Sequence, residues 1–371
     1  MLDHRFVAFA IALFTTAVIA DARAEIRIGI AAPLTGPYAW SGEQVRVGAD
    51  LALRELNQRG GVLGEPLVAV VADDFCDPEQ ALAAANKLVA EGVAVAVGHQ
   101  CSGAAIPASA IYEDAGIVFI TPAATNPLLT ESGLRYTFRI CGRDDVQGAM
   151  IAEHLAKAWR DASIAIVHDG QTYGRGIAEE AKRQLEERGI EPALFEQVQP
   201  GQTEFSKLVA ALERHGIGIV FYGGYTAEAG LLARQAKARL TALGFVVPDG
   251  VATDDFPLIA GDAAEGILMT SVMDAAGQAA AADAVAAFRA AGIEPSGSEL
   301  YAYAAVQVWA HAVEQSGTTD AARVAELLRN EQFESVLGRI GFDGKGDVYG
   351  YEPFSWYIWT DGKYVPKDLT D

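Results

Sequence analysis

Short apolar runs alternate with longer amphipathic segments along most of the chain. Each run is six to eight residues long and lacks an alternating polar face, which is typical of parallel strands covered on both sides. After the first run, Val45, Ala49, Leu53 and Leu56 share one helical face, and Gly60 follows as a helix stop. The pattern predicts repeated strand–helix units, with strands over residues 26–33, 67–74, 93–98, 117–122, 163–169 and 217–224.

The strand–helix series restarts near residue 163, and the second series is too long to extend the same sheet. The 371 residues are 51% hydrophobic, which is enough for two cores. We therefore predict an α/β fold with two doubly wound parallel-sheet lobes. Residues 275–287, rich in alanine, are expected to form helix and connector. Ligands of such sheets bind beyond the carboxyl ends of the strands, so the residues that follow each strand are the first candidates for a site.

The first 24 residues have the pattern of a secretory signal peptide. Arg5 precedes an apolar run over residues 6–20, and Ala22 and Ala24 form a small-x-small cleavage pattern. A membrane anchor is the alternative, but the run is shorter than the ~20 residues that a spanning helix needs. We expect cleavage near Ala24 and an exported, soluble mature chain.

Charge and cysteine count narrow the possible partners and the chemistry. The 28 basic and 49 acidic residues give a net charge of −21, which argues against nucleic acid and anionic membranes as partners. Export favours disulfide formation, and three cysteines, at positions 76, 101 and 141, allow one bridge and one leftover thiol.

Residues 98–109, "GHQCSGAAIPAS", place a histidine, a cysteine and a serine close together. A catalytic Cys101 activated by His99 is conceivable, but a disulfide would consume the thiol. The G-x-S-x-G, Walker-type and G-x-G-x-x-G motifs are absent, and the six histidines have no metal-type partners, so we predict no enzyme, metal or cofactor. Ser102 and Gly103 open a helix after a strand, where free N–H groups make an anion site. A plain N-cap serine is the alternative.

Several stretches together resemble the periplasmic branched-chain amino-acid-binding proteins of bacterial ABC importers. They occur in the family's order over nearly the whole mature chain: "IAAPLTGPYAWSGEQ", "DDFCDPEQALAAANKLV", "GHQCSGAAIPAS", "YEDAGIVFITPAAT", "IAIVHDGQTYGRG", "FYGGYTAE" and "PDGVA". The resemblance implies a type I periplasmic binding protein, in which a three-strand hinge joins two lobes and ligand binds between them.

The resemblance also implies where the chain passes between the lobes. Lobe 1 would take residues 25–143 and 274–350, and lobe 2 residues 144–273 and 351–371. Gly142 and the "GRDD" stretch would mark the first crossing. By the same resemblance Cys76 and Cys101 would form the disulfide, and Cys141 would be buried and inert.

The family pattern assigns the lobe 1 half of the ligand site. Ser102 would hold the ligand's α-carboxylate with its N–H and hydroxyl groups. Thr125 would contact both the carboxylate and the ammonium, and the carbonyl of Ala123 would accept a hydrogen bond from the ammonium. Without the resemblance, the stretch 121–125 would be taken as a turn before Pro127.

The family pattern assigns aromatic and acidic residues of lobe 2 as well. Tyr173 and Tyr225 each follow a strand and match lid residues that close over the ligand, although single loop tyrosines are usually just surface. Asp249 matches the carboxylate that pairs with the ligand's ammonium, as a dry cleft requires for a buried cation.

The sequence departs from the family pattern at three places, so the resemblance does not specify which ligand binds. Asp249 stands where the family usually has glutamate, which is one methylene longer and would reach about 1.5 Å further. The family's aromatic residue is missing at Ser41 and Trp40 precedes it, while Gln100 replaces an apolar pocket residue. The ligand could therefore be a branched-chain or related amino acid, or another small carboxylate or amide.

The resemblance implies a monomeric carrier that delivers its ligand to a membrane permease. A sensor that signals to a receptor is an alternative, because it would bind its ligand and close in the same way. A secreted two-lobed α/β enzyme is disfavoured because the motifs above are absent.

Overall fold

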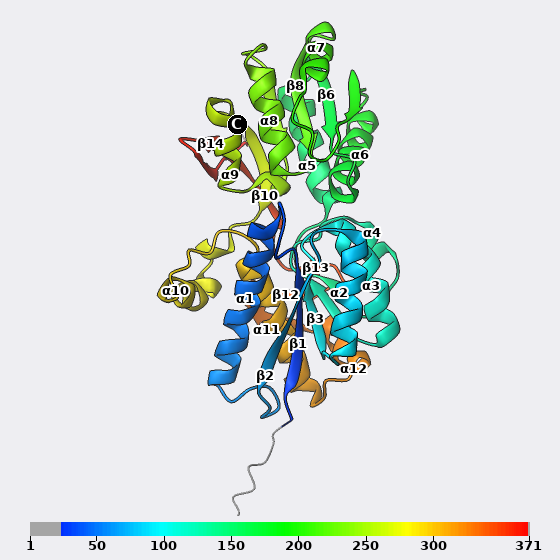
Figure 1. The fold of residues 1–371 in the computed structure, drawn as a ribbon, viewed down its shortest axis with the longest axis vertical. Coiled ribbons are helices and arrows are strands. Elements are labelled where there is room, and N and C mark those ends of the chain that lie inside the picture. Colours follow the sequence, from blue (N-terminus) through cyan, green and yellow to red (C-terminus); the bar gives the residue numbers. More distant parts are fainter. Residues whose placement is uncertain (1–23, 370–371) are drawn as a thin grey trace, which may run out of the picture.

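The computed structural model describes residues 24–369. Residues 1–23 of the predicted signal peptide lie outside that range. Within it, no helix is both long and apolar enough to cross a membrane. The described chain forms two bodies stacked along the long axis of the molecule and joined at a narrow waist (Figure 1).

The first body, called the lower body here, is built around a five-stranded parallel sheet in the order β2-β1-β3-β4-β5. Its strands are buried on both faces, as the continuous apolar runs predict. One face packs against α1, α11 and α12, and the other against α2 and α3. The elements are β1 (Ile26–Ala32), α1 (Ala39–Gln58), β2 (Leu67–Asp73), α2 (Pro78–Ala90), β3 (Val95–Gly98), α3 (Ser102–Ala115), β4 (Val118–Thr121), α4 (Leu128–Glu131), β5 (Thr137–Arg139), α10 (Ala282–Ala290), α11 (Ser298–Ser316) and α12 (Ala321–Asn330).

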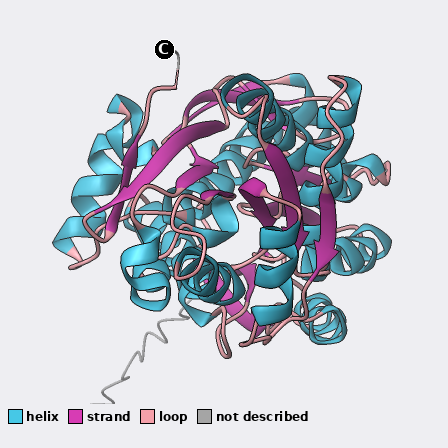
Figure 2. Cartoon of the chain, turned by 90° about the horizontal axis from the view of Figure 1, so that it is seen from above, coloured by secondary structure: helices cyan, strands magenta, loops and turns pink. Residues whose placement is uncertain are grey.

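The second body, called the upper body, contains a seven-stranded sheet in the order β15-β14-β10-β9-β8-β6-β7. Helices α5 and α6 cover one face and α7, α8 and α9 the other (Figure 1). Seen from above, helices lie on both sides of the strands (Figure 2). The pairs β10–β14 and β14–β15 are antiparallel, so one edge departs from the predicted parallel pattern. The elements are α5 (Asp144–Ala158), β6 (Ser163–His168), α6 (Thr172–Glu187), β7 (Leu194–Gln197), α7 (Ser206–Arg214), β8 (Ile217–Gly223), α8 (Thr226–Lys237), β9 (Gly244–Val247), α9 (Asp255–Ala260), β10 (Leu268–Val272), β14 (Phe354–Thr360) and β15 (Lys363–Pro366).

A small antiparallel sheet in the order β11-β12-β13 completes the lower body. It consists of β11 (Gln332–Ser335), β12 (Gly338–Phe342) and β13 (Val348–Tyr349). A parallel bridge between Arg139 and Asp347 ties it to the edge strand β5. The chain therefore leaves the first sheet after β5 and enters the second sheet through α5 and β6. It returns after β10 and re-enters the second sheet at β14, so each body is built from separate segments.

Close packing of α1 on α11 explains one of the glycines in the chain. A Cβ on Gly48 would lie 2.1 Å from the backbone oxygen of Glu299, so only glycine allows the two helices to approach so closely. The predicted face of α1, with Val45, Ala49 and Leu53, is buried in the same interface. Packing of this kind holds the start of α1, which borders the cleft, in place.

The starts of two helices bear on the site. Helix α6 begins at Thr172, after the Asp169 carboxylate has accepted the N–H of Gln171 at 2.9 Å. The N-cap of α3 is Cys101, so the N-cap alternative for Ser102 is wrong. Ser102 is the first helical residue, and its hydroxyl oxygen accepts the N–H of Asn126 at 3.2 Å.

Candidate ligand-binding cleft

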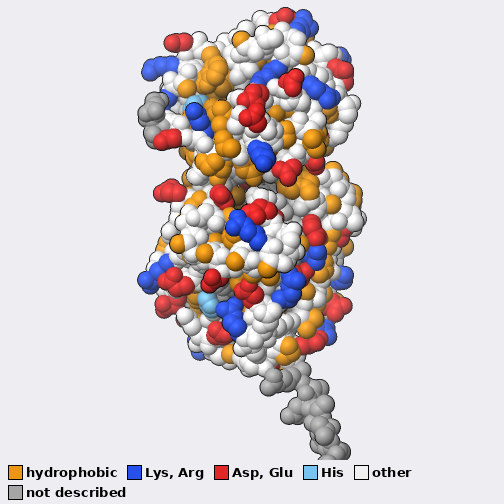
Figure 3. Space-filling model, turned by 90° about the vertical axis from the view of Figure 1, so that its left-hand side faces the viewer, with side chains coloured by type: hydrophobic (Ala, Val, Ile, Leu, Met, Phe, Trp, Pro, Cys, Tyr) orange, Lys and Arg blue, Asp and Glu red, His pale blue; other side chains and the backbone are white. Residues whose placement is uncertain are grey.

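A cavity of about 740 Å³ lies at the waist, between the carboxyl ends of strands from both sheets. Its size is typical of a small-molecule site. The side view of the surface shows hydrophobic and acidic side chains along the waist (Figure 3). The structure brings all nine residues of the sequence-predicted site to the walls of this cavity: Trp40, Ser41, Gln100, Ser102, Ala123, Thr125, Tyr173, Tyr225 and Asp249.

The wall from the lower body contains the strand-to-helix turn between β3 and α3. Gly98 and His99 have φ angles of 138° and 44°, and a Cβ on Gly98 would lie 1.9 Å from the carbonyl oxygen of Ala31. This left-handed turn brings the start of α3 to the cavity. The first hydrogen bonds within α3 start at the N–H of Ala104, so the N–H groups of Ser102 and Gly103 precede the helical ladder. Such N–H groups suit an anion.

Three interactions fix this turn from below. Cys76 and Cys101 form a disulfide, with Cα atoms 5.4 Å apart, and Cys141 is a free, buried thiol. Nδ1 of the fully buried His99 lies 2.7 Å from Oδ2 of Asp74, and its Nε2 lies 3.0 Å from the hydroxyl of Tyr112. His99 thus supports the fold of the turn, and the bridged Cys101 has no thiol with which to act as a nucleophile.

The turn after β4 forms the neighbouring part of the same wall. The hydroxyl of Thr121 accepts the N–H groups of Ala123 and Ala124 at 3.3 and 3.0 Å, which folds residues 121–125 into a compact turn. Thr125 is 1% exposed, and its carbonyl oxygen accepts the N–H of Asp144 at 3.0 Å. Ser102 and Thr125 both line this wall of the cavity.

The opposite wall, from the upper body, contains a carboxylate held by polar side chains. Oδ1 of Asp249 accepts hydrogen bonds from the hydroxyl of Tyr173 at 2.6 Å and from Nε2 of Gln147 at 3.1 Å. The Tyr173 hydroxyl in turn accepts the N–H of Gly250 at 3.0 Å. Burial raises the pKa of the Asp249 carboxyl, and the two hydrogen bonds oppose that rise. The wall presents an oriented negative charge once this carboxyl ionises.

Three tyrosine rings cross from one body to the other at the mouth of the cavity. The ring centroids of Tyr38 and Tyr225 are 4.7 Å apart, and those of Tyr225 and Tyr173 are 5.2 Å apart. Hydrogen bonds also join the bodies: Nε2 of Gln171 donates to the Tyr38 hydroxyl at 3.2 Å, and Nδ2 of Asn126 donates to the Thr172 carbonyl at 2.9 Å. The two bodies are therefore in direct contact beside the cavity.

A second carboxylate, Asp144, lies behind the wall at the first residue of α5. It is fully buried, and neither of its carboxylate oxygens has a hydrogen-bond partner that meets the usual geometric criteria. Burial, and then the negative charge of Asp249, raise its pKa well above the usual range, while the hydroxyl of Thr125 and the charge of Arg139 oppose that rise. A carboxyl in such surroundings is far easier to keep protonated than ionised.

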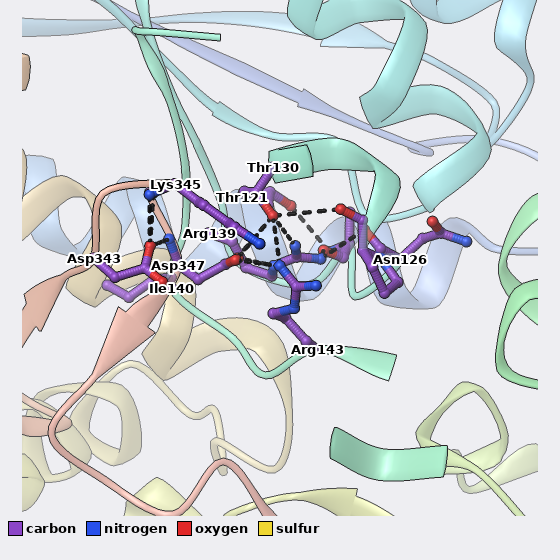
Figure 4. A network of polar contacts seen from close by, with 12 residues as sticks. Thr121, Asn126, Thr130, Arg139, Ile140, Arg143, Asp343, Lys345 and Asp347 are labelled. Carbon is purple, nitrogen blue, oxygen red and sulfur yellow. Dashed lines mark hydrogen bonds and ion pairs between the residues drawn. The ribbon is translucent and has the colours of Figure 1, made fainter. Parts of the chain in front are cut away.

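A buried polar network supports the first crossing between the bodies (Figure 4). Arg139 is fully buried and donates to Oδ1 of Asp347 at 2.8 Å and to the carbonyl of Asn126 at 2.8 Å. Arg143 donates to Oδ2 of the same Asp347 at 2.5 Å, and Thr130 joins the network through its hydroxyl. Asp347 thus ties the end of β5, the short helix α4 and the residue before α5 together.

The departures from the family pattern at Trp40, Ser41 and Gln100 have different contacts in the structure. Trp40 lies at the cavity wall, while the hydroxyl of the buried Ser41 donates to the Tyr38 carbonyl at 2.9 Å and so serves the first turn of α1. Tyr38 supplies an aromatic ring three positions before Ser41, where this chain lacks the aromatic residue of the family pattern. Oε1 of Gln100 is buried without a hydrogen-bond partner.

Sequence reasoning missed several residues that build the site. Gln147, Tyr38, Gln171 and Asn126 hold wall residues or join the bodies, and Asp144 lies behind Asp249. The segment "DDVQG" beside the expected crossing could have indicated two of these residues, because Asp144 and Gln147 are three positions apart and share a helix face. The wall also extends to residues 271–277, 294–298, 300–301, 363–364 and 366, which were not predicted.

Two α/β bodies, three chain crossings and a polar cavity between facing strand ends define a two-lobed binding protein. Residues 25–352 match the model of the family described as periplasmic binding protein, and the chain belongs to that family. Membership places the protein in the periplasm as a binding protein, and not among enzymes.

Known relatives cover nearly the whole chain. It is 42% identical over 347 residues to a "Leu/Ile/Val-binding protein homolog 1" of Brucella abortus, covering 93% of this chain and 94% of the relative. It is also 42% identical over 360 residues to a "Leucine-, isoleucine-, valine-, threonine-, and alanine-binding protein" of Pseudomonas aeruginosa, covering 96% and 95%.

Solved structures agree with the fold. A leucine-binding protein from Thermotoga maritima superimposes with a TM-score of 0.84 at 25% identity, covering 92% of this chain and 98% of that one. A branched-chain amino acid transporter substrate-binding protein from Streptococcus pneumoniae, solved in complex with isoleucine, gives a TM-score of 0.81 at 26% identity, covering 93% and 100%.

Proposed function

We propose that this protein binds an α-amino acid in the cleft between its two bodies and delivers it to the permease of an ABC importer. The observation that carries the proposal is the pairing of opposite half-sites. Helix-start N–H groups and hydroxyls face the cavity from below, and the Asp249 carboxylate faces it from above. A zwitterion with one anionic and one cationic end is complementary to both walls. The names of the two relatives point to amino acids of the aliphatic class.

Each predicted residue has a role in this proposal. Ser102 holds the α-carboxylate through its N–H and hydroxyl hydrogen, because its oxygen already accepts the Asn126 N–H. Thr125 bridges carboxylate and ammonium, and the carbonyl of Ala123 accepts from the ammonium. Asp249 pairs with the ammonium, held in place by Tyr173. Tyr225 covers the ligand, and Trp40, Ser41 and Gln100 line the side-chain end of the pocket.

The two bodies correspond to lobes that close by a hinge. We assign residues 25–143 and 274–350 to lobe 1 and residues 144–273 and 351–371 to lobe 2. Sheet membership of the strands supports this division. The network around Asp347 would act as a fixed end of the hinge, since it clamps the chain on both sides of residues 140–143.

Export and oligomeric state belong to the same proposal. Residues 1–24 act as a signal peptide that is removed near Ala24, and the mature protein is a monomer. A sensor that signals to a receptor instead of a permease would use the same binding step.

A related small carboxylate or amide is the second candidate ligand. The unpaired amide oxygen of Gln100, a residue of the cavity wall, favours it, because a purely aliphatic side chain would leave that oxygen without a partner. Amino acids with a side-chain hydroxyl or amide satisfy both this wall and the two half-sites.

A thermal-shift screen of purified protein tests the proposal. The panel contains aliphatic and hydroxyl amino acids, their amides, and aromatic and aliphatic carboxylates without an amino group. A ligand present at 100 times its Kd should add about 2.7 kcal/mol of stability. Stabilisation by amino acids alone supports the proposal, and stabilisation by carboxylates alone contradicts it. Small-angle scattering with the best ligand would report whether the lobes also close.

A further inference from the structure

Asn126, in the turn after β4, joins the lower half-site to the upper body. It is 4% exposed and is not one of the residues that line the cavity. Its backbone N–H donates to the hydroxyl oxygen of Ser102 at 3.2 Å, and its side-chain Nδ2 donates to the carbonyl of Thr172 at 2.9 Å. One residue is therefore bonded to a predicted ligand contact in one body and to the first residue of α6 in the other.

Two more hydrogen bonds hold Asn126 in the lower body. Nη1 of the buried Arg139 donates to its carbonyl oxygen at 2.8 Å, and its Oδ1 accepts the N–H of Leu128 at 3.0 Å. Its side chain points away from the network around Arg139 (Figure 4). All four polar atoms of Asn126 are thus engaged, three of them within the lower body. Only the bond of the amide nitrogen depends on where the upper body lies.

The amide nitrogen meets the segment that carries the upper half-site. Thr172 is followed directly by Tyr173, whose hydroxyl donates to Asp249 at 2.6 Å. The contact is close, because a Cβ on Gly176, one turn further along α6, would lie 2.4 Å from Nδ2 of Asn126. The bond from Asn126 to Thr172 therefore ties the two half-sites together, and a hinge opening that separates the bodies must break it.

We propose that Asn126 couples carboxylate binding to lobe closure. Its N–H engages the oxygen of Ser102 and leaves the hydroxyl hydrogen free for the ligand's carboxylate, and hydrogen bonds in such a chain strengthen one another. Its amide holds α6 in the closed position. This inference rests on the proposed function and adds Asn126 as a positioning residue that does not touch the ligand.

Stopped-flow fluorescence with L-leucine and L-threonine tests the role of the amide in the whole protein. Asn126→Asp keeps the shape of the side chain and the acceptor for the Leu128 N–H, but it replaces the donor to Thr172 by an oxygen. We expect the release rate constant to rise by about two- to tenfold. The association rate constant should change little, because changes within one interface act mostly on release. A residue that only shaped the turn would tolerate this change, so release at the parent's rate would overturn the inference.

Asn86→Asp is the matched control. Nδ2 of Asn86 also donates to a backbone carbonyl, that of Leu82 at 2.8 Å, but both residues lie on α2 in the lower body. This variant should release both amino acids at the parent's rate. Release that accelerates equally in Asn86→Asp and Asn126→Asp would trace the effect to the added charge and contradict the inference.

Gly176→Ala tests the same bond from the upper body. Gly176 lies within α6 and has no positive φ angle, so alanine suits the helix at this position. The added methyl group would displace the amide of Asn126, and release should accelerate as in Asn126→Asp. Addition of Asn126→Ala makes room for the methyl group, so this double variant should release no faster than Asn126→Ala alone. An unchanged release rate in Gly176→Ala contradicts the inference, even if Asn126→Asp does not fold.

A double-mutant cycle tests the coupling itself. Ser102→Ala leaves the N–H of Asn126 without its acceptor and so loosens the residue that holds α6. Combined with Asn126→Ala, it should raise Kd by at least about threefold less than the product of the two single effects, because coupled residues do not act additively. Single effects that multiply would contradict the coupling.

The proposed function and this inference fail in different ways. If neither amino acid binds the parent, the proposed aliphatic ligand class is wrong and the inference falls with it. If they bind, and both Asn126→Asp and Gly176→Ala release them at the parent's rate, only the role of Asn126 fails.

Discussion

The lower body contributes backbone N–H groups and hydroxyls to the cleft, whereas the upper body contributes a carboxylate and phenol groups. The lower half-site comes from short turns after two adjacent strands, β3 and β4, and a disulfide fixes it. The upper half-site collects side chains from α5, α6 and the segment after β9, which are up to 102 residues apart. One half offers neutral hydrogen-bond donors, and the other offers a buried carboxylate held by hydrogen bonds. The comparison indicates that carboxylate binding depends on backbone geometry, while ammonium binding depends on charge and therefore on pH.

Asp249→Asn should have the largest effect, because it removes the charge of the upper half-site and keeps its size. Loss of one partner of a buried charge pair typically costs about 2–5 kcal/mol, which is at least about 30-fold in Kd. Titration calorimetry with the best amino acid measures it. Ser102→Ala is the matched change in the lower half-site. It should weaken the binding free energy by less, about 1.5–3 kcal/mol at most, since the helix-start N–H groups remain. A larger loss in Ser102→Ala would reverse the comparison.

Removal of the disulfide should destabilise the folded turn that carries the lower half-site. The bridge closes a loop of 25 residues, and a double Cys76→Ser, Cys101→Ser variant should lose about 3 kcal/mol of stability. Denaturant unfolding of the variant and the parent measures this difference. Ligand should recover part of it, because Ser102 still presents its N–H group. An unchanged unfolding midpoint would show that His99, Asp74 and Tyr112 suffice to hold the turn.

Asp169→Asn tests whether a buried acid lowers the stability of the upper body at neutral pH. Burial raises the pKa of Asp169 from 3.8 to about 6. A raised pKa in the folded state stabilises below about pH 4, and this contribution is lost as the pH rises through about 6. The variant should therefore be more stable than the parent at neutral pH by up to about 3 kcal/mol, with the gap closing in acid. Unfolding at a series of pH values measures the gap, and a gap that does not change with pH contradicts the assignment.

Tyr38→Phe should have the smallest effect. It keeps the ring against Tyr225 and removes only the hydroxyl that accepts from Gln171 across the mouth. A hydrogen bond of this kind contributes about 0.5–1.5 kcal/mol, so Kd should rise by about two- to tenfold. Stopped-flow fluorescence should assign the loss to faster ligand release. An unchanged release rate would indicate that the stacked rings alone hold the mouth shut.

The sequence predicted the two halves unequally well. Apolar runs located the strands that matter for the lower half-site within two residues, and Ser102 was identifiable because it directly follows such a strand. Strands β5, β7 and β9–β15 are too short or too mixed in polarity to stand out. The bond from Gln147 to Asp249 and the bond from Gln171 to Tyr38 join residues 102 and 133 positions apart, and local periodicity carries no information about such pairs. Asp249 itself came from the family pattern alone.

The most direct test of the account compares one ligand with its own fragments on the parent protein. The α-amino acid that stabilises most in the screen is titrated beside its analogue without the amino group and its analogue without the carboxyl group. The account predicts that each analogue binds at least about tenfold more weakly, since each lacks a charged group that one half-site holds by hydrogen bonds of about 1.5–3 kcal/mol. An analogue without the amino group that binds as tightly as the amino acid would contradict the claim that the upper half-site is built for an ammonium.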